Sequence, residues 1–331
     1  MTYYDILKRQ KGDGLAINLI LSSVYRPGLN PNPHIFAYVR RAAERLLGKA
    51  SVHSNYVSEA RSKIESYDAV LLVGGSLDRQ VVPLSIECRK RGNPLVFWAT
   101  DDPYEIDHNL EHLDLVDRIW TNDRSSLAFY PREKSSHLPL AADPDEHILN
   151  TLANESEYWY DVSFVGVEFP NRRAIIEQLV PTLRKLRTAI VGPNWSINED
   201  FIIRKRVTNR QASAISNHSL CVLNLARRFS LNNARQIIPS TPGPRTFEVG
   251  GCGTVQVISP ELPEVEDYYR PSVEMEFCGT IEDMKTRIED LVSDSVRRKK
   301  IAEAAIERTK TSHIYDNRVS QILETLSDLL P

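Results

Sequence analysis

The chain has 331 residues, of which 41% are hydrophobic and 26% charged, and its formal net charge is -3. The composition is typical of globular proteins, and the length favours two domains of roughly 150 residues. The charge excludes an overall positive field that would draw the protein to nucleic acid or acidic membranes. The four cysteines, Cys88, Cys221, Cys252 and Cys278, are scattered, which argues against a disulfide framework or a zinc site.

The N-terminal residues show no export pattern. The stretch Met1–Gly14 carries Lys8, Arg9 and Lys11, and the apolar run that follows spans only about eight residues. A signal peptide needs a longer apolar region with different flanks, and no stretch of the chain reaches membrane-spanning length. We therefore expect a cytoplasmic protein without a membrane span.

The first half of the sequence alternates short apolar strands with helices. The predicted strands are Leu15–Ser22, Tyr67–Val73, Pro94–Ala99, Val116–Thr121 and Ser136–Pro139, and the predicted helices are Ile35–Leu47 and Gln80–Arg91. Apolar strands between amphipathic helices indicate a parallel sheet that is covered on both faces. The polar, acidic stretch Asp143–Tyr160 is interpreted as the connection between two domains.

A second α/β series follows. Its predicted strands are Asp161–Gly166, Thr188–Val191, Ser219–Leu225, Thr254–Ile258 and Met275–Phe277, and its predicted helices are Arg172–Leu186, Phe247–Gly251, Ile281–Val292, Val296–Thr309 and Tyr315–Leu330. Asn171 is the predicted N-cap of the first of these helices. Ligands of open α/β sheets bind beyond the carboxyl ends of the strands, so the loops there are the candidate sites.

The most informative of these loops reads PRTFEVGGCG over residues 244–253. It places Glu248 on a short helix that ends in small residues, which would let the helix approach a ligand closely. A carboxylate there can accept two hydrogen bonds from a ribose diol. The alternative is an ordinary solvated helix acid.

Two other strand ends in this half carry polar and basic residues. One strand ends at Gly166 and leads into a helix whose first turn holds Arg172 and Arg173. Backbone N–H groups at a helix start favour anions and arginine matches phosphate, whereas cations there are unfavourable without a bound anion. For Arg173, a solvated face is the better interpretation. The predicted strand Ser219–Leu225 delivers Asn224 and Arg228, although an asparagine at a strand end is as often a turn former.

In the first half, two loops are candidates for catalysis. The loop Ser22–His34 places His34 directly before a helix, and Thr100–Pro103 places two acids at the end of a strand. An aspartate there could bind an acceptor hydroxyl or act as a base, and the alternative is capping of the turn at the proline. We assign Asp102 to the turn and Asp101 to the acceptor, with His34 as the next candidate.

These segments together resemble the CgeB-like (spore maturation protein type) glycosyltransferases of the group-1 GT-B family, over residues 60 to 325. The resemblance is carried by R-x-F-E followed by C-G around Glu248, by F-V-G before Arg172, by L-N and then a basic residue from Asn224 to Arg228, by D-D-P at 101–103, by LPLAAD at 138–143 and by H-x-Y-x-x-R at 313–318. Ser240 stands where more remote group-1 members carry a second glutamate.

The resemblance implies a GT-B fold, with two Rossmann-like domains facing across a cleft and a C-terminal helix that crosses back. The expected divisions are an acceptor-side domain at 1–150, a nucleotide-sugar-binding domain at 151–312 and a crossover helix at 313–331, with the motif at 313–318 setting the interdomain hinge. The resemblance also implies a nucleotide-sugar donor held by Glu248 on the ribose, Arg172 on the diphosphate, and Asn224, Arg228, Arg245 and Gly166 nearby.

The predicted function is therefore transfer of a sugar from a nucleotide-sugar donor to an unidentified acceptor: a polysaccharide, a protein, a small molecule or modified DNA. We expect retention of anomeric configuration. No cofactor or metal is expected, because the only D-x-D match, at 143–145, lies in the predicted linker. A nucleotide-sugar epimerase of the same fold and a non-catalytic two-lobed binding protein stay open as alternatives.

Overall fold

The computed structural model describes residues 17–24, 34–148, 152–228 and 233–330. The chain divides into two compact units, the first made of Met1–Leu140, Ser230–Pro239 and Tyr315–Pro331, and the second of Ala141–Phe229 and Ser240–Ile314. Each unit contains one parallel sheet, which confirms the predicted α/β class with two domains. The N-terminal segment of the first unit ends at Leu140 rather than at residue 150, because the chain that follows packs within the second unit.

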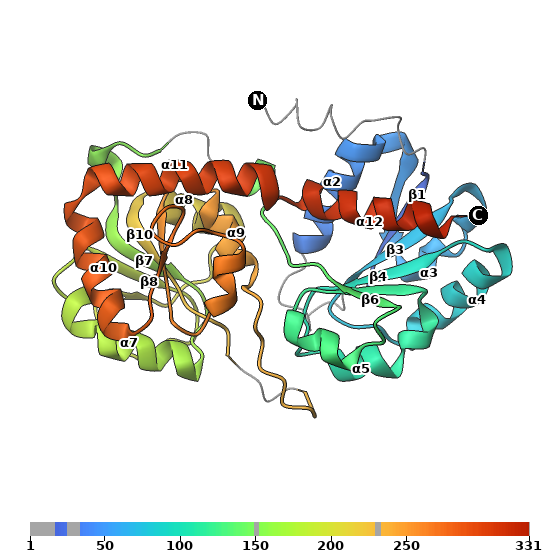
Figure 1. Cartoon of the computed structure of the whole chain (residues 1–331), viewed down its shortest axis with the longest axis horizontal. Helices are drawn as coiled ribbons and strands as arrows, with labels where there is room; N and C mark the ends of the chain where they lie inside the picture. The colour runs from blue at the N-terminus through green and yellow to red at the C-terminus, as the bar shows by residue number, and fades with distance from the viewer. Residues whose placement is uncertain (1–16, 25–33, 149–151, 229–232, 331) are drawn as a thin grey trace. The chain divides into compact units, whose positions relative to one another are not determined.

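In the first unit, the described residues form a six-stranded parallel sheet in the order β2-β1-β3-β4-β5-β6 (Figure 1). The strands are β1 (Leu19–Ser23), β2 (Val52–Tyr56), β3 (Ala69–Gly74), β4 (Leu95–Ala99), β5 (Arg118–Thr121) and β6 (Ser135–His137). All residues of β1, β3 and β4 are buried, as expected for strands covered on both faces. The edge strand β2 was not predicted, because its sequence VHSNY is polar and mostly half-buried.

Helices and short 3-10 turns connect these strands. They are α2 (His34–Leu47), η1 (Lys49–Ser51), α3 (Val57–Ala60), η2 (Ile64–Ser66), η3 (Arg79–Val81), α4 (Val82–Arg91), α5 (Ile106–Glu111), η4 (Leu113–Leu115), η5 (Arg124–Phe129) and α12 (Tyr315–Leu329). In Figure 1, α12 lies alongside α2. Arg45 of α2 donates two hydrogen bonds of 2.8 Å to the Asp316 carboxylate of α12, which fixes the C-terminal helix within the first unit.

A short segment after β10 also belongs to the first unit. The backbone N–H of Ala234 donates to Asp107 of α5 over 2.6 Å, and Arg235 forms an ion pair with the same carboxylate. Ile237, only 6% exposed, joins the hydrophobic core that contains Val70 and Phe97. These residues anchor the segment on the first unit, although the chain on both sides of it belongs to the second.

In the second unit, the described residues form another six-stranded parallel sheet, in the order β12-β11-β10-β7-β8-β9. The strands are β7 (Tyr160–Val165), β8 (Thr188–Val191), β9 (Ile202–Ile203), β10 (Ser219–Asn224), β11 (Val255–Ile258) and β12 (Glu276–Phe277). The helices and turns are α6 (Pro144–His147), η6 (Glu155–Glu157), α7 (Pro170–Leu183), α8 (Asn209–Asn217), α9 (Pro244–Gly250), η8 (Pro263–Asp267), α10 (Ile281–Ser293) and α11 (Ser295–Ser312).

The helices α7 and α6 show how local sequence sets a helix start differently from the expectation. The helix α7 begins at Pro170, with Phe169 as its N-cap, because proline suits the first helical position. Asn171 is therefore not the cap, and its side chain donates to Ala226 O over 3.0 Å and to Glu261 over 2.7 Å. The predicted linker begins with the helix α6, whose N-cap Asp143 accepts a hydrogen bond of 3.1 Å from the backbone N–H of residue 145.

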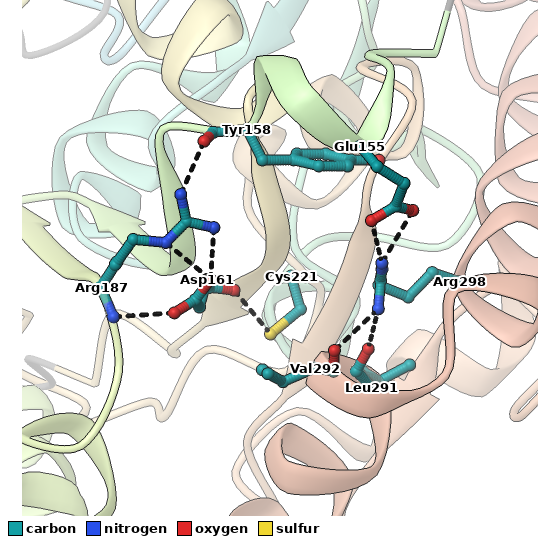
Figure 2. Close-up of polar contacts among 8 residues, drawn as sticks. All are labelled: Glu155, Tyr158, Asp161, Arg187, Cys221, Leu291, Val292 and Arg298. Carbon is teal, nitrogen blue, oxygen red and sulfur yellow. Dashed lines mark hydrogen bonds and ion pairs between the residues drawn. The ribbon is translucent and has the colours of Figure 1, made fainter.

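Two arginines of the second unit each bind several partners (Figure 2). Arg187, directly before β8, binds the Asp161 carboxylate of β7 through its backbone N–H, at 2.8 Å, and its guanidinium, at 2.6 Å. Arg298 of α11 donates to Leu291 O and Val292 O at the end of α10, and also binds Glu155. The last carbonyls of a helix have no partner within it, so Arg298 satisfies two of them.

The motif H-x-Y-x-x-R is embedded in packing contacts. The ring of His313 lies 5.3 Å from that of Phe247, and its Nε2 lies 2.9 Å from Tyr268 O. Arg318 of α12 donates to Pro139 O over 2.9 Å. The motif thus contributes structural contacts within each unit, and its role as a hinge stays a prediction.

Candidate functional site

The candidate site lies at the carboxyl edge of the second sheet. There β7 leads to Gly166, β10 ends at Asn224, and the loop after β10 leads to α9 and then back into β11. Parallel strands end at a common edge, so the residues that the sequence singles out in this unit come from neighbouring loops.

The helix α9 is fixed to the sheet by a buried amide network. Asn224 Nδ2 donates over 2.8 Å to Thr246 Oγ1 in the first turn of α9, and over 2.8 Å to Gln256 Oε1 in β11. Gln256 Nε2 in turn donates to Thr246 O over 2.9 Å. Both N–H groups of Asn224 are therefore used in positioning the helix, a role that its sequence context did not predict.

Glu248 points from α9 into a nearly closed environment, with its side chain only 8% exposed. Arg245, one turn earlier, places Nη1 3.0 Å from Oε2 of Glu248. The other oxygen, Oε1, lies 3.8 Å from Nε2 of His147 in α6. The carboxylate is thus enclosed between a cation and an imidazole.

His147 is a residue that the sequence interpretation missed. Its side chain is entirely buried, and its Nδ1 accepts a hydrogen bond of 3.0 Å from the backbone N–H of Asp143. Burial lowers the pKa of His147, although the facing Glu248 carboxylate acts in the opposite direction. The ring is therefore neutral at neutral pH, and because Nδ1 accepts, the proton resides on Nε2 and faces Glu248. An Asp-Pro N-cap signature at 143–144 is the signal that could have revealed this helix.

The glycines at the end of α9 serve internal packing. A Cβ on Gly250 would lie 2.5 Å from the Tyr269 hydroxyl oxygen and 2.8 Å from Thr309 Oγ1, and a Cβ on Gly251 would lie 2.7 Å from His147 O. The sequence suggested that these small residues allow close approach to a ligand. The structure shows that they let α9 pack closely against its protein neighbours, and their role toward a ligand stays a prediction.

Arg172 lies at the predicted place beside Gly166, but its guanidinium is engaged by backbone carbonyls. It donates to Val167 O at 3.0 Å, and to Leu225 O and Ala226 O at 3.1 Å. A Cβ on Gly166 would lie 3.2 Å from Arg172 Nη1 and 2.7 Å from an atom of the Phe164 ring, so a glycine is needed there. These contacts tie the loop after β7 to the end of β10. The diphosphate role of Arg172 stays a prediction.

The remaining predicted donor residues are the arginines at 228 and 245. Arg228 is exposed and follows the end of β10, whereas the side chain of Arg245 is 32% exposed at the start of α9. Both can present charge to an anion, since a partly exposed guanidinium binds one ligand while retaining other contacts.

In the first unit, the two adjacent acids have different surroundings. Asp101 is 8% exposed, and its carbonyl accepts hydrogen bonds from the N–H groups of Tyr104 and of residue 105, which closes the turn. Asp102 is 2% exposed, and its carboxylate accepts from Thr121 Oγ1 at 2.7 Å, Tyr130 OH at 2.9 Å and Asn109 Nδ2 at 2.9 Å. The Asp102 carboxylate therefore binds three side chains rather than the backbone of the turn, which corrects the sequence-based assignment.

Burial raises the pKa of Asp102 to about 6, and the three hydrogen bonds only partly offset that effect. His34, the other catalytic candidate, begins α2 as an exposed residue, and its ring lies 6.4 Å from that of Tyr38. Most of the loop before His34, residues 25–33, lies outside the described residues.

A groove is also present at the opposite, amino end of the second sheet, lined by η6 and α11. Its most buried cation, Arg298, is bound to Glu155 and to the end of α10. Of the motif residues, Gly253 alone is among those that line this groove, so we place the candidate site at the carboxyl edge. Across the described ranges, no three His, Cys, Asp or Glu side chains are grouped as metal ligands.

Residues 172–324 match a family model described as "Glycosyl transferase-like". The chain is also 23% identical over 303 residues to the spore protein CgeB of Bacillus subtilis (strain 168), covering 85% of this chain and 92% of that protein. These matches confirm the resemblance to CgeB-like proteins and identify a glycosyltransferase.

Solved structures confirm the GT-B fold. HepE of Anabaena in complex with UDP-glucose superposes with a TM-score of 0.62 at 12% identity, over 94% of this chain and 99% of HepE. A glycosyltransferase of Rickettsia africae has a TM-score of 0.63 at 9% identity, over 95% of this chain and 98% of that one. Among the residues that the structure describes, no helix is long and apolar enough to span a membrane.

Proposed function

We propose that this CgeB-like glycosyltransferase binds a nucleoside-diphosphate sugar in its second unit, with the Glu248 carboxylate accepting hydrogen bonds from the ribose hydroxyls. The observation that carries the proposal is the carboxylate itself, which is 8% exposed and fixed by Arg245 on the helix after β10. Each carboxylate oxygen has two acceptor positions, so these contacts leave capacity for a diol. The UDP-glucose bound to HepE supports this class of donor.

The diphosphate of the donor would lie near the basic residues of the same edge. Arg228 follows β10, and Arg245 lies in the first turn of α9. Arg172 lies beside Gly166 at the end of β7. Arginines there would stabilise the negative charge that develops on the leaving diphosphate as the sugar bond breaks. Because three carbonyls already engage Arg172, we assign the larger share of this role to Arg228 and Arg245.

The first unit would supply the acceptor side, with Asp101 as the group that contacts the acceptor hydroxyl and His34 as the second candidate. We further propose that transfer retains the anomeric configuration and needs no divalent metal. Transfer that persists in excess EDTA would support the second point, and loss of activity that Mg²⁺ or Mn²⁺ restores would overturn it.

Titration with nucleoside diphosphates and their sugars tests the proposal. We expect Glu248→Gln to weaken binding of the preferred nucleotide by at least about tenfold, as for a lost hydrogen bond to a charged group. The control is Glu177→Gln in α7, because Glu177 also pairs with an arginine on its own helix but is 48% exposed. Equal affinities in the two variants would remove Glu248 from the site. Interconversion of donor epimers without transfer would instead identify an epimerase.

A further inference from the structure

The Glu248 carboxylate faces a side chain, His147, that a bound donor cannot reach. His147 has no exposed surface, whereas the Glu248 side chain retains 8% exposure. A ligand can therefore contact the carboxylate but not the imidazole. Any effect of His147 on binding must pass through Glu248 or through the fold.

The contacts of the imidazole are directional. Its Nδ1 is occupied by the backbone N–H of Asp143 at 3.0 Å, so the neutral ring carries its proton on Nε2. That proton faces Oε1 of Glu248 across 3.8 Å, while Arg245 lies 3.0 Å from Oε2. A small rotation of the carboxylate would bring Oε1 within hydrogen-bond distance, since such contacts between N and O span about 2.7–3.2 Å.

We infer that His147 is a positioning residue for ribose recognition: its Nε2–H and the Arg245 guanidinium hold the two oxygens of Glu248 in the orientation that a ribose diol requires. This inference rests on the proposed function of Glu248. A neutral donor suits this role, because it orients the carboxylate without neutralising the charge that attracts the hydroxyl protons. The fixed geometry comes from α6, whose Asp143 N-cap places the imidazole, and from Gly251, which lets α9 approach His147 O.

Two amide substitutions separate the two contacts of the ring. In His147→Asn, the short amide can still accept from the Asp143 N–H but carries no group at the position of Nε2. In His147→Gln, the longer amide can place an N–H near the position of Nε2 but loses the acceptor at Nδ1. The first variant removes the contact with Glu248 and the second keeps it.

The readout is the preference for ribose over a sugar that lacks both hydroxyls. Binding of UDP, ADP, GDP and CDP to the full chain identifies the preferred base, and the probe pair is that nucleotide and its 2′,3′-dideoxy form. We expect the wild-type preference, about tenfold or more, to fall to within about twofold of unity in His147→Asn. In His147→Gln it should persist within about threefold of wild type. A purely structural role would weaken both probes equally and leave their ratio unchanged.

The other outcomes distinguish failure of the inference from failure of the proposed function. A ratio that persists in His147→Asn but falls in Glu248→Gln overturns the inference while leaving the proposed function intact. A ribose preference that falls in His147→Gln and persists in His147→Asn would show that the imidazole acts only by stabilising α6. This result would likewise overturn the inference. If none of the four nucleotides binds, or if Glu248→Gln leaves the ratio unchanged, the proposed function fails and the inference fails with it.

Discussion

The hydroxyl group of Tyr130 donates a hydrogen bond of 2.9 Å to Oδ2 of Asp102, joining the end of η5 to the loop after β4. Thr121 donates to the same oxygen and Asn109 to the other, so a buried carboxylate connects three parts of the first unit. Because burial raises the pKa of Asp102 to about 6 from 3.8, its protonation links stability to pH.

The direction in which stability changes with pH follows from whether the folded or the unfolded state binds the proton on Asp102. Between pH 3.8 and 6 the folded state holds a proton on Asp102 that the unfolded state has lost, so this group makes stability fall as pH rises through that window. Across that pH range, we expect the unfolding free energy of wild type to fall by about 3 kcal/mol relative to that of Asp102→Asn, because the asparagine side chain does not titrate. Urea unfolding of both proteins at pH 4, 5, 6 and 7 measures the difference, and parallel pH curves would contradict it.

Arg172→Ala should destabilise the second unit. The substitution removes the donors to Val167 O, Leu225 O and Ala226 O, and we expect a loss of about 1–3 kcal/mol in unfolding free energy. The control is Arg173→Ala, because Arg173 is exposed and forms its ion pair with Glu177 of the same helix. Titration with nucleoside and nucleoside diphosphate adds the functional result. A loss confined to the diphosphate would place the guanidinium on the donor, and an equal loss would assign Arg172 to the loop alone.

Arg298→Leu should lower stability by about 1–3 kcal/mol without altering nucleotide affinity. It leaves Leu291 O and Val292 O at the end of α10 without their donor and removes the partner of Glu155, at the edge opposite the candidate site. Lys299→Leu on the same helix is the matched control, since the Lys299 side chain is 69% exposed. Stability losses of equal size in the two variants would show that the helix, rather than the contacts of Arg298, determines the effect.

Asp101→Asn tests the acceptor side. If the carboxylate assists proton transfer from the acceptor, we expect kcat for transfer to fall by about 10²-fold or more. Donor affinity should stay within about twofold of wild type, because the proposed donor residues belong to the second unit. Glu111→Gln, at an exposed position of the same unit, is the control. A normal transfer rate in Asp101→Asn would direct attention to His34.

The sequence predicted the sheets better than the contacts of the site. The central strands are buried on both faces, so their apolar runs are visible without a structure, and the motif around Glu248 could be placed after β10 by its position in the chain. The edge strand β2 could not be predicted, because a polar strand such as VHSNY lacks an apolar run. Its identity depends on pairing with β1, which only the folded chain establishes.

The direction in which each side chain points was the second feature that the sequence could not predict. The sequence shows that Arg172 follows Gly166 closely. It does not show that three carbonyls lie within reach of the guanidinium, because two of them belong to a loop more than fifty residues later. In the same way, His147 lies about a hundred residues before Glu248. Both contacts arise from packing between elements that are distant in sequence, and local patterns carry no information about them.

The anchoring of residues 233–239 on the first unit has a practical consequence for anyone who wishes to express the halves separately. A fragment ending at Leu140 would lack both Ile237, which completes its core, and α12, which pairs with Arg45. A fragment running from Ala141 to Ile314 would carry Ile237 and Arg235 without the partners they have in the intact protein. Neither stretch of sequence corresponds to a self-contained folding unit, so dissection of donor and acceptor binding is better done by point substitution than by truncation.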